Sequence, residues 1–149
     1  MISKKEGFSL VEVILTLLVL GVLSAVIIPR FGGKDFLSEF GLKGVSAQIT
    51  SDIRLTRQLA ITKTSHYLIK FDCAQKEYNI YKGSFSPENA IQETKKIPVN
   101  ISCSGTNQFD FYPIGNCIFS GSGLTLSSGA KQRRIIVEPP SGAVLIEEL

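Results

Sequence analysis

The feature that most constrains this chain is an apolar run of 21 residues near its N-terminus, from Phe8 to Ile28. Sixteen of these residues are hydrophobic, and one, Glu12, is ionisable. As an α-helix, the run would extend about 31 Å, close to the roughly 30 Å thickness of the hydrocarbon core of a bilayer. Its apolar residues lie on all sides of that helix, which disfavours an amphipathic surface helix. The run therefore predicts a membrane-spanning helix over residues 8–28, ended by Pro29 and Arg30.

The rest of the chain has the composition of an ordinary soluble domain. The protein has 149 residues, with 16 Lys and Arg against 13 Asp and Glu, and a formal net charge of +3. This length excludes a large multidomain enzyme, and the weakly basic balance argues against a dedicated nucleic-acid binder. We therefore expect one small domain over residues 29–149.

Two other interpretations of the apolar run remain open. Lys4 and Lys5 before it suit a secretory signal peptide that is removed, although the run is longer than the usual length of about 7 to 15 residues. A plain, uncleaved anchor is the other interpretation. Neither explains Glu12, because a carboxylate at mid-depth in a bilayer costs about 2.5 to 3.5 kcal/mol and requires a cation. An α-amine created at Phe8 would lie about 6 Å away along the helix, on the side of Glu12, either on its own helix or on that of a neighbouring chain.

The N-terminal residues resemble the processing signal of type IV prepilins. The matching residues are Lys4-Lys5-Glu6-Gly7, followed by Phe8-Ser9-Leu10-Val11-Glu12 and the apolar run. The resemblance implies that a prepilin peptidase cuts between Gly7 and Phe8, that Phe8 is then N-methylated, and that Glu12 guides the packing of subunits. It also implies a leader over residues 1–7, a helix in the bacterial inner membrane and a C-terminal domain in the periplasm. Ser9 stands where Thr is commoner in that family.

Periodicity predicts the elements of the soluble domain. Apolar residues at helical spacing predict an amphipathic helix from about Lys43 to Lys63, with Gln48, Asp52, Arg54, Arg57 and Lys63 facing away from its apolar side. Glycines between Gly32 and Gly44 predict that the helix loosens or breaks before it, at roughly 1 kcal/mol each relative to Ala. After Ser65 the period changes to two, which predicts a hairpin of residues 67–71 and 77–82. An exposed loop over residues 83–96 follows, with strands near 97–102, 108–112, 116–119, 124–127, 134–138 and 143–147.

A helix followed by antiparallel strands predicts an α+β fold in which the helix packs on one face of a sheet. This order also resembles the minor pseudopilin H of type II secretion systems and the FimT-like minor pilins. The residues that carry this likeness are Asp52-Ile53-Arg54, Arg57, Ala60-Ile61, Phe111-Tyr112-Pro113-Ile114-Gly115, Leu124-Thr125-Leu126-Ser127, Ile135-Ile136-Val137 and Gly142-Ala143-Val144. It implies a pilin-like fold and a non-enzymatic minor subunit at or near the tip of a secretion pseudopilus or a type IV pilus. The implied partners are the prepilin peptidase, other pilins or pseudopilins, and the inner membrane.

The sequence predicts neither a catalytic site nor a cofactor site. His66 is the only histidine, and we expect it at the surface, at the start of a strand. A single imidazole with no nearby pattern of Cys or carboxylates is a poor metal site or general base. Gly121-Ser122-Gly123 lacks the Lys-Ser/Thr that follows in a phosphate-binding loop, so we interpret it as a turn. We therefore expect no enzymatic activity, no cofactor and no metal.

Three cysteines in a domain that faces an oxidising compartment suggest one disulfide and one remaining thiol. We expect the bond to join Cys103 to Cys117, because these residues flank one predicted strand. Cys73 would then be free. Three buried free thiols are the alternative.

Lys131, Arg133 and Arg134 form the one compact basic cluster after the apolar run. In a FimT-like minor pilin, such a cluster would bind DNA for uptake, and this is the alternative function. However, Glu147 and Glu148 make the C-terminus acidic, and removal of Lys4, Lys5 and Glu6 with the leader lowers the net charge from +3 to +2. We therefore expect a solvated hairpin tip and no nucleic-acid partner.

Overall fold

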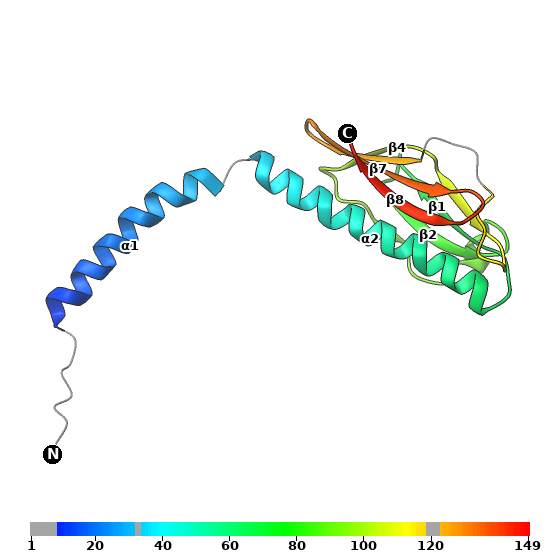
Figure 1. The fold of residues 1–149 in the computed structure, drawn as a ribbon, viewed down its shortest axis with the longest axis horizontal. Coiled ribbons are helices and arrows are strands. Elements are labelled where there is room, and N and C mark those ends of the chain that lie inside the picture. The colour runs from blue at the N-terminus through cyan, green and yellow to red at the C-terminus, as the bar shows by residue number, and fades with distance from the viewer. Residues whose placement is uncertain (1–8, 32–33, 119–122) are drawn as a thin grey trace, which may run out of the picture. The chain divides into compact units, whose positions relative to one another are not determined.

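The computed structural model describes residues 9–31, 34–118 and 123–149 (Figure 1). The chain divides into two compact units, Met1–Leu37 and Ser38–Leu149. The first unit contains helix α1, Leu10–Phe31, and the second contains most of helix α2, Lys34–Thr62, together with all of the described strands.

Helix α1 begins directly after Ser9, whose carbonyl oxygen accepts the backbone N–H groups of Glu12 and Val13 at 2.9 and 3.2 Å. It continues past Pro29, where the sequence predicted its end, to Phe31. A proline in the last turn removes one backbone hydrogen bond, and the helix closes two residues later. Within the described residues, no helix has the combined length and hydropathy of a segment that crosses a bilayer.

Helix α2 is longer than predicted, because it includes Gly41 and Gly44 and starts at Lys34 rather than near Lys43. Leu42, between the two glycines, is 1% exposed. Burial of such a side chain contributes about 1.5 to 3 kcal/mol, which offsets the cost of the glycines in the helix. Residues 32–33, where part of the predicted break falls, lie outside the described residues.

The described strands form two antiparallel sheets of four strands each. The first has the order β3-β2-β1-β5 and the second the order β4-β6-β7-β8. In the first sheet, the strand bounds are Tyr67–Asp72 for β1, Glu77–Lys82 for β2, Lys95–Lys96 for β3 and Gln108–Phe111 for β5. In the second sheet they are Ser102–Gly105 for β4, Leu124–Ser128 for β6, Lys131–Glu138 for β7 and Ala143–Glu148 for β8.

The hairpin of β1 and β2 is confirmed, with Asp72 opposite Glu77 at its closed end. There the Asp72 carboxylate accepts the backbone N–H groups of Ala74 and Gln75, both at 3.0 Å, as is typical of an Asx turn. The predicted loop 83–96 also contains a short 3-10 helix, Pro87–Asn89, and strand β3.

The strand predicted over residues 97–102 is wrong. Ile97 and Ile101, at 3% and 0% exposure, belong to the core, but the backbone between them forms a turn in which the Ile101 N–H donates to Pro98. The strand predicted over 116–119 is reduced to one bridge between Cys117 and Phe111, and residue 119 lies outside the described residues. Strands near 108–112, 124–127, 134–138 and 143–147 are present as β5, β6, β7 and β8.

The α+β fold is confirmed, with α2 running alongside the sheets (Figure 1). Helix α2 buries Ile49 and Ile53 completely against side chains from both sheets, including Phe109 of β5 and Ile135 of β7. The buried aromatic rings cluster in the first sheet, where Phe71 stacks on Tyr78 at 5.2 Å between ring centroids. One hydrophobic core therefore holds the helix and the two sheets together.

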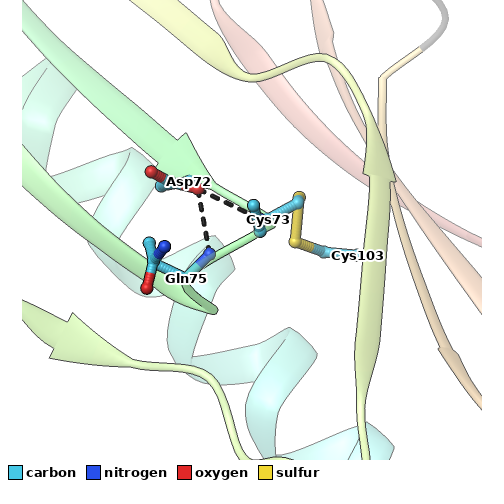
Figure 2. The surroundings of a disulfide bond; sticks show 5 residues. Asp72, Cys73, Gln75 and Cys103 are labelled. Carbon is cyan, nitrogen blue, oxygen red and sulfur yellow. Dashed lines mark hydrogen bonds between the residues drawn. A yellow bond between two sulfur atoms is a disulfide. The ribbon is translucent and has the colours of Figure 1, made fainter.

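The predicted disulfide between Cys103 and Cys117 is wrong. Cys103 on β4 is bonded to Cys73, which lies in the turn after β1 (Figure 2), and Cys117 is a buried free thiol. The prediction placed Cys103 and Cys117 on either side of one strand. In the fold, β4 belongs to a different sheet from β5 and lies beside the β1–β2 turn, with 5.4 Å between the Cα atoms of Cys73 and Cys103. The bond therefore connects the first sheet to the second.

Candidate functional site

The predicted processing residues, Gly7 and Phe8, lie outside the described residues. The described chain starts two residues after the predicted scissile bond, and Glu12 lies in the first turn of α1. A carboxylate there is favoured by the positive end of the helix dipole. Glu12 is exposed, and within the described part of the chain it forms no ion pair.

The surface of α1 is apolar around its whole circumference. Every side chain from Leu10 to Val26 is exposed. Its two hydroxyl groups are bonded within the helix, because Thr16 donates to the carbonyl of Val13 at 2.8 Å and Ser24 to that of Leu20 at 2.7 Å. Such internal bonding leaves no unsatisfied hydroxyl donor toward an apolar environment. Glu12 is therefore the one charged group on this surface between residues 9 and 26.

In the second unit, Arg57 connects the C-terminal part of α2 to the turn at Gly115. Its Nε donates to the carbonyl oxygen of Gly115 at 2.9 Å. Gly115 and Gly142 both have positive φ, at +81° and +69°, and a Cβ on Gly142 would collide with the carbonyl oxygen of Gly115. A Cβ on Gly115 would lie 2.7 Å from Ile61. These close contacts explain why both positions suit glycine, and the hydrogen bond from Arg57 to Gly115 was not predicted from the sequence.

A second polar contact that the sequence analysis missed involves Asp52. The prediction placed it on the exposed side of the helix, but its side chain is buried, with the residue 6% exposed. Its carboxylate accepts the hydroxyl of Tyr78 at 2.7 Å and pairs with the ammonium of Lys95 at 2.7 Å. Burial, followed by the hydrogen bond to Asp52, raises the pKa of Tyr78. The contact ties α2 to β2 and β3.

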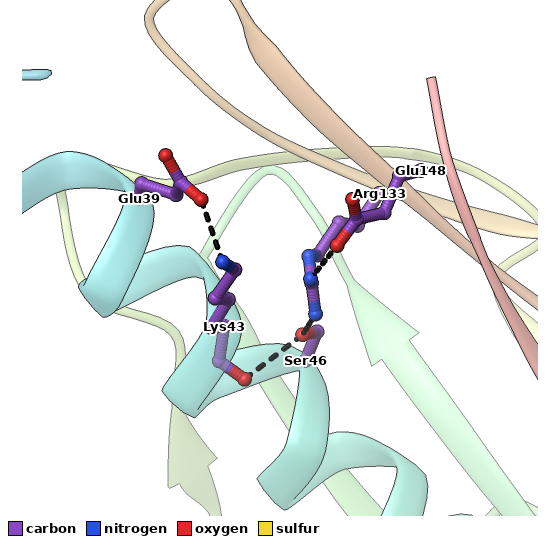
Figure 3. A network of polar contacts seen from close by, with 5 residues as sticks. All are labelled: Glu39, Lys43, Ser46, Arg133 and Glu148. Atoms are coloured by element: carbon purple, nitrogen blue, oxygen red, sulfur yellow. Dashed lines mark hydrogen bonds and ion pairs between the residues drawn. The ribbon is translucent and has the colours of Figure 1, made fainter. Parts of the chain in front are cut away.

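The basic cluster is partly neutralised by carboxylates. Arg133 pairs with Glu148 and donates to the hydroxyl of Ser46 on α2 at 3.3 Å, while Lys43 pairs with Glu39 at 2.6 Å (Figure 3). The hydrogen bond and charge of Lys43, with the charges of Lys131 and Arg133, lower the pKa of Glu39. The cluster is therefore part of a mixed-charge network between α2 and the second sheet. This arrangement gives no support to the DNA-binding alternative.

His66 lies at the start of β1, as predicted, but is half-buried. Its Nδ1 is 2.6 Å from the carbonyl oxygen of Gly83, and its Nε2 is 3.0 Å from the carboxylate of Asp110. The ring also contacts that of Tyr112 at 4.8 Å between centroids. These contacts connect three segments of the first sheet. Among the described residues, no group of three or more His, Cys, Asp or Glu is placed to hold a metal ion.

Comparison with known proteins first identifies the N-terminal motif. Residues 2–28 match the family model described as the prokaryotic N-terminal methylation motif. No curated protein matches the sequence at a significant level.

The fold is similar to those of minor pilins and pseudopilins. One match is the minor pseudopilin EpsH from the type 2 secretion system of Vibrio cholerae, with a TM-score of 0.55 and 10% identity over 72% of this chain and 96% of that chain. A second is the type IV minor pilin FimU of Pseudomonas aeruginosa, with a TM-score of 0.59 and 12% identity over 75% and 92% of the two chains. Another crystal form of FimU gives a TM-score of 0.57 at 11% identity, over 71% and 92%.

The chain carries the prokaryotic N-terminal methylation motif, and its fold is that of minor pilins and pseudopilins. The resemblance that the first residues suggested is thereby confirmed for the motif and for the fold. The roles predicted for Gly7, Phe8 and Glu12 stay predictions, as does the closer likeness to pseudopilin H and the FimT-like pilins.

Proposed function

We propose that this protein is a non-enzymatic minor subunit of a filament of the type II secretion or type IV pilus kind. A prepilin peptidase removes residues 1–7 by cleavage between Gly7 and Phe8, and Phe8 is N-methylated. Residues 8–28 anchor the subunit in the inner membrane by a single pass, and residues 29–149 fold in the periplasm. The subunit then joins other pilins or pseudopilins in the filament.

The observation that carries this proposal is the surface of α1, most of which lies within the methylation motif. Helix α1 is apolar on all sides, its hydroxyls are bonded internally, and its one carboxylate lies in the first turn. A surface helix of a soluble protein has instead one apolar and one polar side. Helix α1 suits a bilayer before assembly and a bundle of similar helices afterwards. The disulfide Cys73–Cys103 supports the periplasmic location, because such bonds persist in oxidising compartments.

Glu12 has a defined role in this proposal. Its carboxylate pairs with the N-terminal amine at Phe8 of a neighbouring subunit inside the filament, where the low dielectric strengthens the attraction. In the isolated subunit the same carboxylate is a cost, because it lies on an otherwise apolar helix. The free-energy cost of placing this carboxylate in the membrane is therefore offset when the carboxylate pairs with the amine in the filament.

The test compares Glu12→Ala with Thr16→Ala, a matched control one turn further along α1. We expect Glu12→Ala to be cleaved at Gly7 and inserted as well as the wild type, since it removes a charge from the apolar helix. We expect its crosslinking to other pilins to fall at least about tenfold, because an unpaired buried amine costs several kcal/mol. Thr16→Ala should assemble normally, since its hydroxyl bonds only within the helix.

Intact-mass measurement on membrane-extracted wild-type protein checks the first step. A chain that begins at Phe8 and carries one additional methyl group agrees with the proposal. An N-terminus at Met1, or one near Val26, contradicts it. Normal assembly of Glu12→Ala would remove Glu12 from the packing contact while leaving the processing step intact.

A further inference from the structure

Among the described strands, four lie at the edges of the two sheets: β3 and β5 in the first, and β4 and β8 in the second. An edge strand presents a row of unpaired backbone N–H and C=O groups. Folded proteins protect such edges by keeping them short, placing Lys or Pro on them, or covering them with other segments.

Three of these edges are protected. Strand β3 has two residues, and both are lysines. Strand β4 has four residues and is tied to the β1–β2 turn through Cys103. Strand β5 pairs with β1 on one side, and its Phe111 forms an isolated β-bridge with Cys117.

Over its first four residues, strand β8 has none of these protections within the described part of the chain, and its two charged residues, Glu147 and Glu148, come last. It has six residues without Lys or Pro, and its first four are Ala143-Val144-Leu145-Ile146. Leu145 and Ile146, which point to opposite faces of the sheet, are 45% and 40% exposed. Both faces of the edge are therefore apolar and open at this point.

The register with β7 shows which backbone groups are unpaired. The N–H of Leu149 donates to the carbonyl of Gln132 at 3.1 Å, one step beyond the pair of Arg133 with Glu148. Because hydrogen-bonded and non-hydrogen-bonded pairs alternate in an antiparallel ladder, the N–H and C=O groups of Val144 and Ile146 point away from β7. A strand added here would receive bonds at both residues.

We propose that this edge of β8 binds an extended segment of a neighbouring subunit of the filament, a different pilin or pseudopilin. The identity of the partner as a filament subunit rests on the proposed function. Leu145 and Glu147 share one face of β8, and Glu147 forms no ion pair within the described residues. The bound segment therefore carries an apolar residue over Leu145 and a Lys or Arg two positions away, opposite Glu147.

The direction of β8 argues against a second copy as the occupant. The strand starts after Gly142, beside Arg57 of α2, and ends at Glu148, whose partner Arg133 contacts Ser46. Strand β8 thus runs opposite to α2. Two copies paired through antiparallel β8 strands would have their α2 helices in opposite directions. Such a pair is a closed two-fold contact, whereas the subunits of a filament repeat head to tail in one direction.

The test is photo-crosslinking of the full chain in the bacterium that makes its filament. Leu145 is replaced by the photoreactive residue benzoylphenylalanine, and Val99, 88% exposed in a loop, serves as the control position. We expect position 145 to crosslink to another pilin-type subunit at least about tenfold more than position 99. The crosslinked peptide, sequenced by mass spectrometry, should contain the apolar and basic residues two positions apart.

Two variants made in the Leu145-substituted chain test the backbone pairing and the charge. Ile146→Pro removes a backbone N–H that points to the partner and leaves the hydrogen bonds to β7 intact. Ile146→Val is its control, because it keeps the N–H and the hydrogen bonds to β7. Glu147→Lys places a protective charge on the edge, and Glu138→Lys makes the same change on β7. We expect Ile146→Pro and Glu147→Lys to lower the crosslink at least about fivefold and the two controls to leave it unchanged.

Equal crosslinking at positions 145 and 99, capture of lipid or of a second copy, or full crosslinking in Glu147→Lys would overturn the inference. If the chain is cleaved and enters the filament fraction without a crosslink at position 145, the edge proposal fails and the proposed function stands. If the chain is not cleaved at Gly7, the proposed function itself fails.

Discussion

The two helices of this protein have similar lengths, 22 residues in α1 and 29 in α2, but they use their apolar side chains differently. Helix α2 buries Leu42, Ile49 and Ile53 to 1% exposure or less against the sheets. In α1, the apolar side chains from Leu10 to Val26 are all exposed. Apolar content alone therefore does not stabilise a fold: α2 is stabilised by packing on its own chain, whereas the exposed apolar side chains of α1 need apolar surroundings from elsewhere.

The first prediction tests this difference with one substitution in each helix. Ile53→Ala, which empties a fully buried position, should lower the free energy of unfolding of the second unit by about 2 to 5 kcal/mol. Leu17→Ala, at a 63% exposed position of α1, should leave it unchanged. Denaturant unfolding of detergent-solubilised full-length protein, followed by the circular dichroism of the sheets, measures both. Equal effects would show that α1 contributes to the folded unit.

The second prediction concerns the bond that joins the two sheets of the second unit. Cys73→Ser with Cys103→Ser should lower the free energy of unfolding by about 3 to 4 kcal/mol, because the bond closes a loop with a sequence separation of 30. The matched control, Cys117→Ser, removes a buried free thiol. Peptide mapping without reduction should recover Cys73 joined to Cys103. Recovery of Cys117 in a disulfide would contradict the structure.

The third prediction concerns pH and also separates the units, because the groups with raised pKa values lie in the second. Burial raises the pKa of Tyr78 and raises that of Cys117 to about 11. A raised pKa in the folded state stabilises the fold at lower pH, and this stability is lost as the unfolded chain ionises, above about pH 10 for Tyr78.

Stability should therefore fall with rising pH by up to about 1.4 kcal/mol per pH unit for each such group. In Tyr78→Phe, the slope above pH 10 should decrease by up to that amount. Thermal unfolding measured from about pH 8 to about pH 11.5, a range that spans these ionisations, provides the comparison. An unchanged slope in the variant would show that Tyr78 ionises in the folded state as it does in the unfolded chain.

The smallest expected effect lies at the start of α2. Gly44→Ala should raise the free energy of unfolding by about 0.5 to 1 kcal/mol, because a Cβ there meets no atom within 4 Å and Ala is the better helix former. Gly115→Ala, at a positive φ and against Ile61, should be destabilising and serves as the contrast. Thermal melts of both variants are sufficient. A destabilising Gly44→Ala would mean that the helix does not extend through this position.

Features that depend on local pattern could be predicted from the sequence. The apolar run of residues 8–28 predicted a helix, and α1 occupies residues 10–31, while its location in a membrane stays a prediction. The change of period from 3.6 to two after Ser65 predicted the hairpin of β1 and β2, and turn residues located β6, β7 and β8 to within a few positions. The methylation motif is a short linear signal, which needs no fold to be recognised.

Features that depend on neighbours distant in the sequence could not be predicted in this way. The partner of Cys103 depends on which strand lies beside β4, and sequence spacing pointed to Cys117 rather than Cys73. The burial of Asp52 follows from the positions of Tyr78 and Lys95, and helical periodicity alone placed it at the surface. The glycines at the start of α2 remain helical because packing of the helix on the sheets outweighs their intrinsic cost. Spacing along a chain fixes which residues share a face, but only the assembled sheets fix what that face meets.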